Sequence, residues 1–353
     1  MTAAGAHTRP LAELRSSDAG VFGGKSASLG ELLQAGIPVP PGFAISASGF
    51  RAFVEEAGLA DRIERALAGV AIGDVERTAA VSKAIGEELR SAPMPEALVE
   101  EIGSRYRELA GTGEPEPPVA VRSSALGEDS PEATFAGQQE TYLWVRGAGV
   151  VRDAVRDCWV SLYSPQAISY RARLGGGETA AMGVTVQLMV DAEVSGVMFT
   201  CNPVSGDPSM VAINASWGLG LAVVGGELTP DDFLVSKVTR EVVKERLSRK
   251  KIEYVPDAHG RGTVRVDVPA ERQKVACLDP SRLAALVDVA RRIERHFGSH
   301  QDIEWAFARC GGELFVLQSR PVTAAARPDE PPKHPASAMS LVMETFGAGR
   351  RAD

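Results

Sequence analysis

The sequence has few cysteines and no long apolar run, and both absences narrow what the chain can be. Its four cysteines, Cys158, Cys201, Cys277 and Cys310, form no C-x-x-C pair, which argues against a zinc or dithiol redox motif. Widely spaced cysteines are typical of reduced thiols in a cytoplasmic protein. No apolar stretch approaches the roughly 20 residues of a membrane span, and the N-terminus has no signal-peptide pattern. We therefore expect a cytoplasmic protein that has no membrane partner.

Positive charge is also in short supply, which bears on the kind of partner. The 353 residues carry 46 acidic against 38 basic side chains, a formal net charge of −8. A chain without a general basic field is poorly suited to hold nucleic acid, so we expect no nucleic-acid partner. The basic run at residues 244–251 is explained most simply as a solvated edge. The length is sufficient for two domains.

Two phosphate-binding fingerprints are incomplete. Gly23-Gly24-Lys25-Ser26 precedes an expected helix, but a P-loop needs a glycine at position 19, where the chain has alanine. Gly218-Leu219-Gly220 lacks the third glycine of a dinucleotide fingerprint, because position 223 is valine. The glycine pair would still let Lys25 approach a phosphate at a helix N-terminus, although a surface turn with a solvated lysine fits equally well. None of the five histidines sits in an evident catalytic setting.

A polar hairpin near the C-terminal end is the most informative feature that is present. Residues two apart in a strand share a face, so Asp302 and Glu304 point one way, and Gln318 and Arg320 also share a face. If Cys310-Gly311-Gly312 forms a three-residue loop, Glu304 lies opposite Gln318, and Asp302 lies opposite Arg320. The pattern therefore gathers two carboxylates, an amide and a guanidinium on one patch.

This donor set suits a magnesium–phosphate site. Mg²⁺ prefers oxygen ligands and usually lies between one or two carboxylates and the phosphates of a substrate. Asp302, Glu304 and Gln318 are the candidate metal ligands, and Arg320 would balance phosphate charge. Taken alone, the same hairpin is more often an ordinary charged strand face exposed to solvent.

A second candidate phosphate site lies at the end of an earlier strand. Arg122 follows the apolar residues 119–121, where its fork of donors is placed to clamp a phosphate. Ser123, Thr134 and the backbone near Gly137 would donate further hydrogen bonds. The alternative is that Arg122 pairs with an acidic residue of the adjoining loop.

Turn residues and apolar spacing predict the order of the elements. A helix is expected to follow Gly23-Gly24-Lys25-Ser26 and to close at Gly36, and another to run from Asp279-Pro280 to Gly298. Residues 151–173 are expected to be helical, and residues 48–110 largely helical with breaks near Gly73 and Pro93. Strands are expected at residues 119–122, 141–145, 183–190, 196–200 and 210–214. We expect an N-terminal phosphate-binding lobe at residues 1–180, a second lobe at 181–325, and a mobile tail at 326–353.

In their order along the chain, these segments resemble the N-terminal ATP-binding domain of the phosphoenolpyruvate synthase, pyruvate phosphate dikinase and rifampicin phosphotransferase family. The resemblance covers about residues 20–323. The matching segments are Gly23-Gly24-Lys25 through Pro41-Gly42-Phe43, Val121-Arg122-Ser123-Ser124-Ala125, Thr134-Phe135-Ala136-Gly137-Gln138, Gln187 to Asn202-Pro203, Trp217-Gly218-Leu219-Gly220, Thr229-Pro230-Asp231, Asp302-Ile303-Glu304-Trp305 and Gln318-Ser319-Arg320-Pro321.

The resemblance implies an ATP-grasp-like α/β (α+β) fold with two lobes and the nucleotide in the cleft between them. It implies ATP and Mg²⁺ as cofactors. The residues it assigns to ATP are Lys25, Arg122, Ser123, Thr134, Gly137, Gln187, Met189, Val190, Glu304, Gln318 and Arg320. Lys25, Arg122 and Arg320 take catalytic roles by this analogy, and Asp302, Glu304 and Gln318 hold the metal.

Departures from the family pattern shape the expected function. No histidine matches the family's phosphohistidine motif, and Leu221 stands where relatives commonly have glutamate. The first hypothesis is an ATP-dependent phosphotransferase subunit that transfers a phosphoryl or pyrophosphoryl group to a histidine on a separate partner protein, which would also bind the acceptor. The alternatives are a kinase or ligase acting directly on a small molecule, and a non-catalytic nucleotide-binding regulator.

Overall fold

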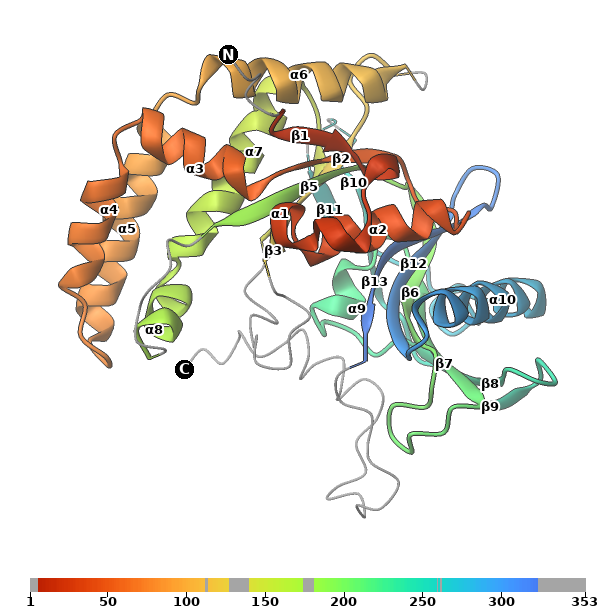
Figure 1. The fold of residues 1–353 in the computed structure, drawn as a ribbon. Helices are drawn as coiled ribbons and strands as arrows, with labels where there is room; N and C mark the ends of the chain where they lie inside the picture. The colour runs from red at the N-terminus through yellow and green to blue at the C-terminus, as the bar shows by residue number, and fades with distance from the viewer. Residues whose placement is uncertain are drawn as a thin grey trace. The chain divides into compact units, whose positions relative to one another are not determined.

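The helices and strands belong to two units. Figure 1 shows the computed structural model, which describes residues 6–111, 114–126, 140–173, 181–258, 260 and 262–322. The first unit comprises residues 1–30 and 41–189, and the second comprises 31–40 and 190–353. The division falls after residue 189, whereas the sequence-based boundary lies near residue 180.

The first unit contains an antiparallel five-stranded sheet. Its strand order is β1-β2-β5-β3-β4. Its strands are β1 (Thr8–Pro10), β2 (Gly42–Ile45), β5 (Met182–Leu188), β3 (Val119–Ala125) and β4 (Thr141–Val145). The central strand β5 pairs with β2 and β3, and six of its seven residues are buried. The expected strand at 183–190 is therefore present and belongs to this sheet.

Helices supply most of the remaining core of the first unit. They are α1 (Ala19–Phe22), α2 (Gly24–Gln34, which continues into the second unit), α3 (Ala47–Glu56), α4 (Ala60–Ala68), α5 (Val75–Ser91), α6 (Glu96–Ala110), α7 (Ala148–Val160) and α8 (Pro165–Arg173), with single 3₁₀ turns at Leu11–Glu13, Ser16–Asp18 and Ser161–Tyr163. Trp159 of α7 packs on Phe50 and Phe53 of α3, with ring centroids 5.5 and 5.6 Å away. The predicted helical region 48–110 is confirmed, with one further break at Gly58 (φ 63°).

The second unit is built on an antiparallel six-stranded sheet. Its strand order is β13-β12-β6-β7-β8-β9. Its strands are β13 (Leu314–Pro321), β12 (Gln301–Ala308), β6 (Ala192–Phe199), β7 (Met210–Trp217), β8 (Asp231–Ser236) and β9 (Val242–Arg246). A separate hairpin joins β10 (Ile252–Pro256) to β11 (Thr263–Asp267), and the helices are α9 (Leu221–Val224) and α10 (Pro280–Phe297).

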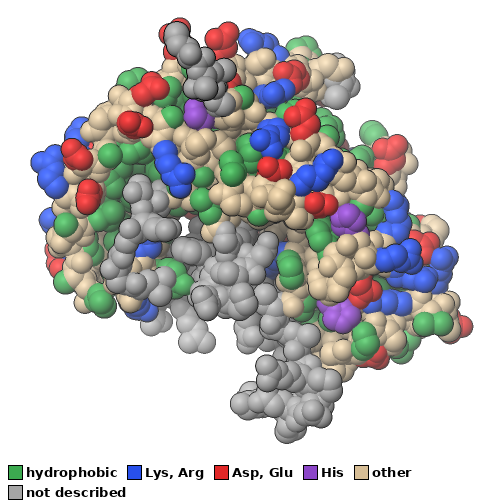
Figure 2. Space-filling model, viewed as in Figure 1, with side chains coloured by type: hydrophobic (Ala, Val, Ile, Leu, Met, Phe, Trp, Pro, Cys, Tyr) green, Lys and Arg blue, Asp and Glu red, His purple; other side chains and the backbone are tan. Residues whose placement is uncertain are grey.

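Helix α10 begins and ends where its sequence predicts. The Asp279 side chain accepts a hydrogen bond from the Arg282 backbone N–H (2.8 Å), and Pro280 occupies the first turn. Gly298 ends the helix in the left-handed conformation (φ 69°). The apolar stripe of α10 is buried and contacts β12, and Figure 2 shows Lys and Arg side chains gathered over the outer side of this helix. The Arg282 guanidinium lies over the Phe307 ring, 5.1 Å from its centroid.

The packing of α10 decides which face of β12 is available for chemistry. Since Phe307 faces α10, the alternating residues Asp302 and Glu304 stand on the other face of the sheet. Among the described residues, none of the helices combines the length and the apolar character needed to cross a bilayer.

Candidate functional site: a polar hairpin and a phosphate-binding end of β3

The polar hairpin has the predicted pairing at the residues that matter. Asp302 lies opposite Arg320, and Glu304 lies opposite Gln318, in the β12–β13 ladder. Directly opposite residues of an antiparallel pair share a face, so all four side chains stand on one side of the sheet. The sequence pattern therefore predicted this register correctly.

The route to that register differs from the predicted one. β12 ends at Ala308 and β13 begins at Leu314, so the loop is longer than three residues and includes two glycines with positive φ, Gly311 and Gly312. Near the loop, Trp305 lies opposite Val316. This register is shifted by one residue from that of the Glu304–Gln318 pair. A β-bulge between these pairs absorbs the extra residue and turns Gln318 and Arg320 to the face of the acids.

Asp302 and Arg320 form a partly buried ion pair. The Nε and Nη2 atoms of Arg320 each donate to Oδ2 of Asp302 at 3.0 Å. The other carboxylate oxygen, Oδ1, is buried and has no hydrogen-bond partner among the described residues. Burial raises the pKa of Asp302 to about 6; Arg320 opposes this shift and the Glu304 carboxylate adds to it. Burial disfavours the charged form of this carboxylate, and its Oδ1 atom is available to coordinate a cation.

The donor set of the hairpin fits a magnesium ion. Asp302 and Gln318 are 6% and 7% exposed, and Glu304 stands between them on the same face. An unpartnered buried oxygen is the kind of group that a metal ion satisfies. No group of three or more His, Cys, Asp or Glu side chains with metal-binding geometry occurs in the described part of the chain. Mg²⁺ held by two carboxylates and an amide would therefore need phosphate or water oxygens to complete its shell.

In the first unit, a glycine brings the start of α2 against the end of β3. A Cβ atom on Gly23 (φ 84°) would lie 2.2 Å from the Ser124 carbonyl oxygen, so only glycine permits this approach. The contact places Lys25 beside the strand, where its Nζ donates to the Ser123 carbonyl oxygen at 3.2 Å. Lys25 is therefore not the solvated lysine of a surface turn.

Arg122 and Gln187 share one face of the first sheet. Arg122 lies opposite Thr185, and Ala120 lies opposite Gln187, in the β3–β5 ladder. Residues two apart share a face, so Arg122 and Gln187 are neighbours on it. The Thr185 hydroxyl is 2.7 Å from the hydroxyl of Ser26 in α2, which puts the first turn of α2 over the same face. Ser123, by contrast, alternates to the other side of β3.

The remaining predicted positions fall at a unit boundary or outside the described residues. The Met189 backbone N–H donates to the Pro118 carbonyl oxygen at 2.9 Å, and the chain passes into the second unit at Val190. Thr134 and Gly137 lie outside the described residues. Leu221 is the first residue of the short helix α9.

Sequence reasoning missed a buried ion pair in the second unit. The Lys250 ammonium donates to the Asp231 carboxylate, and neither side chain is exposed. Asp231 also accepts from the backbone N–H groups of Ser248 and Cys277. The expectation of a solvated edge at residues 244–251 holds for β9, which is exposed throughout, and is wrong at Lys250. The alternation of Asp231 with Phe233 along β8 was a usable signal for its burial.

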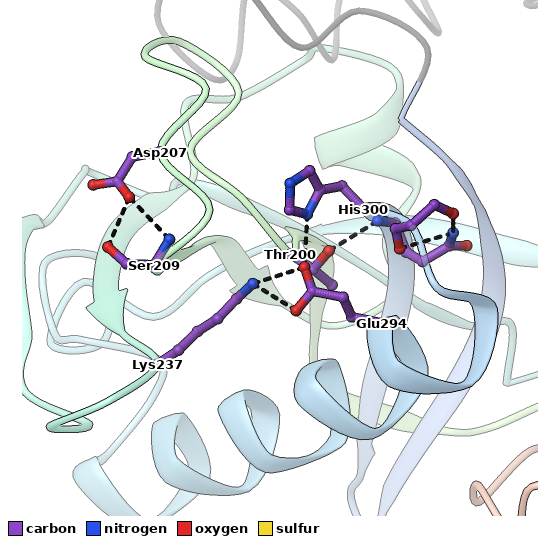
Figure 3. Close-up of polar contacts among 8 residues, drawn as sticks. Thr200, Asp207, Ser209, Lys237, Glu294 and His300 are labelled. Atoms are coloured by element: carbon purple, nitrogen blue, oxygen red, sulfur yellow. Dashed lines mark hydrogen bonds and ion pairs between the residues drawn. The ribbon is translucent and has the colours of Figure 1, made fainter. Parts of the chain in front are cut away.

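A second network, drawn in Figure 3, joins the end of α10 to neighbouring loops. Lys237 Nζ donates to both carboxylate oxygens of Glu294, at 2.8 and 2.6 Å, and His300 Nδ1 lies 2.6 Å from Glu294 Oε1. The Gln301 backbone N–H donates to the Thr200 hydroxyl at 2.9 Å beside them. These contacts hold the start of β12, from which Asp302 and Glu304 project.

Comparison with known families identifies a match over most of the chain. The model of the family described as pyruvate phosphate dikinase, AMP/ATP-binding domain, matches residues 19–340. A probable phosphoenolpyruvate synthase of Methanocaldococcus jannaschii is 41% identical over 315 residues, which cover 89% of this chain and 26% of that protein. The corresponding protein of Archaeoglobus fulgidus is 43% identical and is covered to 41%, with 89% of this chain. The chain thus spans less than half the length of these relatives.

Solved structures resemble the chain only distantly. A biotin carboxylase from Campylobacter jejuni, in complex with an ATP compound, aligns with 83% of this chain and 39% of its own, with a TM-score of 0.27 and 12% identity. A D-alanyl-alanine synthetase A from Vibrio cholerae aligns with 89% of this chain and 62% of its own, with a TM-score of 0.27 and 11% identity. TM-scores this low support no conclusion about the site.

Proposed function

Because the chain belongs to the pyruvate phosphate dikinase AMP/ATP-binding domain family, we propose that it is the ATP-binding, phosphoryl-donating part of a phosphotransferase. The acceptor would be a histidine on a separate partner protein. The relatives named phosphoenolpyruvate synthase, at about 40% identity, support a phosphotransferase of this class. Mg·ATP is the proposed bound form of the nucleotide.

The β12–β13 hairpin is the observation on which the proposal chiefly rests. It aligns Asp302, Glu304 and Gln318 as oxygen donors and holds Arg320 opposite Asp302. Phosphoryl transfer needs little covalent chemistry from the protein, because positioning and charge neutralisation supply most of the catalysis. In this proposal Mg²⁺ neutralises phosphate charge, and Arg320 stabilises the charge that develops on the transferred group.

The first unit would supply the other phosphate contacts and the base contacts. Lys25 and Arg122 are the proposed phosphate cations, and Thr134 and Gly137 the proposed hydrogen-bond donors. Ser123 is dropped from this set, because its side chain stands on the other side of β3 from Arg122 and its N–H and hydroxyl donate to the Glu140 carbonyl oxygen. Gln187, Met189 and Val190 are proposed to meet the adenine. The support is the close approach of Gly23 to Ser124, which fixes the Lys25 ammonium at the Ser123 carbonyl beside Arg122.

The proposed reaction is the transfer of a pyrophosphoryl group from ATP to a histidine. An imidazole nitrogen of the partner attacks the β-phosphorus, a nitrogen–phosphorus bond forms, and the bond from the β-phosphorus to the α-bridging oxygen breaks. AMP leaves with that oxygen, and the phosphorylated ring releases the proton of its other nitrogen to solvent. The acceptor is placed on a partner because none of the five histidines of this sequence matches the family's phosphohistidine motif.

Labelled ATP tests the proposal directly. The pure chain is incubated with Mg²⁺ and ATP labelled at the β-phosphate, alone and with histidine-bearing candidate partners encoded by neighbouring genes. The expected result is AMP formation together with acid-labile, base-stable label on a partner histidine. Glu304→Gln should abolish the labelling, while Glu313→Gln, an exposed acid of the same hairpin loop, should not.

Two outcomes would contradict the proposal. Label that passes to a small acceptor without any histidine-bearing protein would instead show a kinase or ligase. Mg·ATP binding without turnover, with every candidate partner and acceptor, would leave a nucleotide-binding regulator.

A further inference from the structure

Asn214 is a buried polar side chain whose amide oxygen has no partner. It lies in the middle of β7 and is 2% exposed. Its Oδ1 atom makes no hydrogen bond among the described residues. Leaving a buried acceptor unsatisfied is unfavourable, so such groups in folded proteins call for an explanation. Nothing in the assigned site uses this residue.

The register of the sheet puts Asn214 in one row with the polar hairpin. Asn214 lies opposite Val197 of β6, Val197 lies opposite Glu304 of β12, and Glu304 lies opposite Gln318 of β13. The four side chains therefore stand on the same face, in neighbouring strands that Figure 1 shows side by side. Adjacent strands are about 4.8 Å apart, so Asn214 and Glu304 flank the apolar Val197 at roughly 10 Å between their backbones.

The chemistry of the amide oxygen selects the kind of ligand. An amide oxygen accepts hydrogen bonds or coordinates a cation, and it gains nothing from a phosphate oxygen. Val197, between Asn214 and Glu304, offers it no donor. A hydrated Mg²⁺ can satisfy this oxygen in two ways. The ion can coordinate it directly, or one of the several water molecules that magnesium usually keeps can donate a hydrogen bond to it.

We propose that Asn214 is a fourth oxygen donor to the divalent cation of bound Mg·ATP, reaching the ion directly or through one of its waters. This inference rests on the proposed function and extends the metal site from the hairpin to β7. Asn214 thereby helps to fix the cation over the sheet, in the row of Glu304 and Gln318.

Ser216 provides a matched control in the same strand. Its Oγ atom is also buried without a hydrogen-bond partner among the described residues, and it shares the face of Asn214. Its row differs, because Ser216 lies opposite Ser195, which lies opposite Ala306. A purely structural cost of burying a polar group would apply to both positions, whereas cation binding would apply only to Asn214.

The test compares Asn214→Leu with Ser216→Ala in the full chain. Mn²⁺ binding is followed by electron paramagnetic resonance with and without ATP, Mg·ATP binding by calorimetry, and the metal-free fold by thermal unfolding. We expect Asn214→Leu to weaken Mn²⁺ and Mg·ATP binding at least tenfold and to unfold at the same or a higher temperature than the parent. Ser216→Ala should leave both affinities within twofold.

A second variant distinguishes a loss of cation binding from a folding defect. Asn214→Asp adds a negative ligand, so we expect it to bind Mn²⁺ more tightly than the parent. Affinities within twofold of the parent in Asn214→Leu would overturn the inference. So would a lower unfolding temperature in Asn214→Leu combined with no tighter binding in Asn214→Asp, since Asn214 would then be structural.

Failure of the proposed function gives a different result. If the parent does not bind Mg·ATP, the proposed function is rejected, and the titration with Mn²⁺ alone still tests Asn214. An unchanged Mn²⁺ affinity in Asn214→Leu would reject the inference in that case also.

Discussion

Two buried aspartates in the described part of the second unit have opposite surroundings. Asp231, at the start of β8, is fully enclosed, and its oxygens accept from Lys250, Ser248 and Cys277. Asp302, on β12, is almost as deeply buried, yet one of its oxygens bonds only Arg320 and the other has no partner among the described residues. The first carboxylate is satisfied within the fold, whereas the second is left with a vacant acceptor.

This difference is the one expected between a residue that holds the fold and a residue that is proposed to bind a cation. A buried charge is tolerated when a partner charge and several hydrogen bonds compensate it, as they do around Asp231. Around Asp302 compensation is incomplete, and the raised pKa of its carboxyl is the consequence. Residual frustration of this kind is expected where a protein binds a cation. The two aspartates should therefore respond differently to substitution.

The largest expected effect is on stability, at Asp231. Asp231→Asn removes the charge that compensates buried Lys250, and it should lower the free energy of unfolding by about 3–5 kcal/mol. Urea denaturation measures the change. Asp288→Asn, which breaks only the exposed pair with Arg240, is the control and should cost no more than about 1 kcal/mol. Equal losses in the two variants would contradict this account of Asp231.

The next largest effect is on ligand binding, at Glu304. Glu304→Gln keeps the shape of the side chain and removes a charged metal ligand, so Mg·ATP affinity should fall about 100-fold or more. Calorimetry measures the affinity, and urea denaturation should show stability within about 1 kcal/mol of the parent. Unchanged Mg·ATP affinity would remove Glu304 from the metal site.

Asp302 should show the inverse of the behaviour of Asp231. Asp302→Asn removes a carboxylate whose ionised form burial disfavours, so the free energy of unfolding without metal should fall by no more than about 1 kcal/mol, or rise. Mg·ATP affinity should fall between about 10- and 100-fold, because a charged ligand is lost. A stability loss as large as that of Asp231→Asn would erase the distinction between the two sites.

The smallest effect is expected at Arg320. Arg320→Lys keeps the positive charge but cannot donate through two nitrogens to Asp302, so turnover should fall about tenfold or less. Mg·ATP affinity should change less than turnover, since charge is retained. The ratio of kcat to binding affinity, measured once an acceptor protein is in hand, checks this. If Mg·ATP affinity fell and turnover did not, Arg320 would contribute to nucleotide binding and not to stabilising the transition state.

Much of the site was predictable because the relevant patterns are local. The alternation of Asp302 and Glu304, and of Gln318 and Arg320, predicted one polar face, which the pairing confirms. The predicted ATP-grasp-like α+β class agrees with the family match and with the mixed helices and antiparallel sheets. The bulge that sets the final register was not predictable, because it depends on how a five-residue loop closes.

The sequence by itself determined the limits of α10, the polar face of the hairpin and the family of the chain. Helix caps, strand alternation and short motifs each depend on residues that are close together in the sequence. They can therefore be recognised without knowing how distant segments pack. Only the tertiary structure decided that Lys250 is buried with Asp231, that Gly23 must approach Ser124, and that Asn214 shares a row with Glu304. Those outcomes depend on which distant strands become neighbours, since burial and hydrogen-bond satisfaction are properties of the packed chain rather than of any one segment.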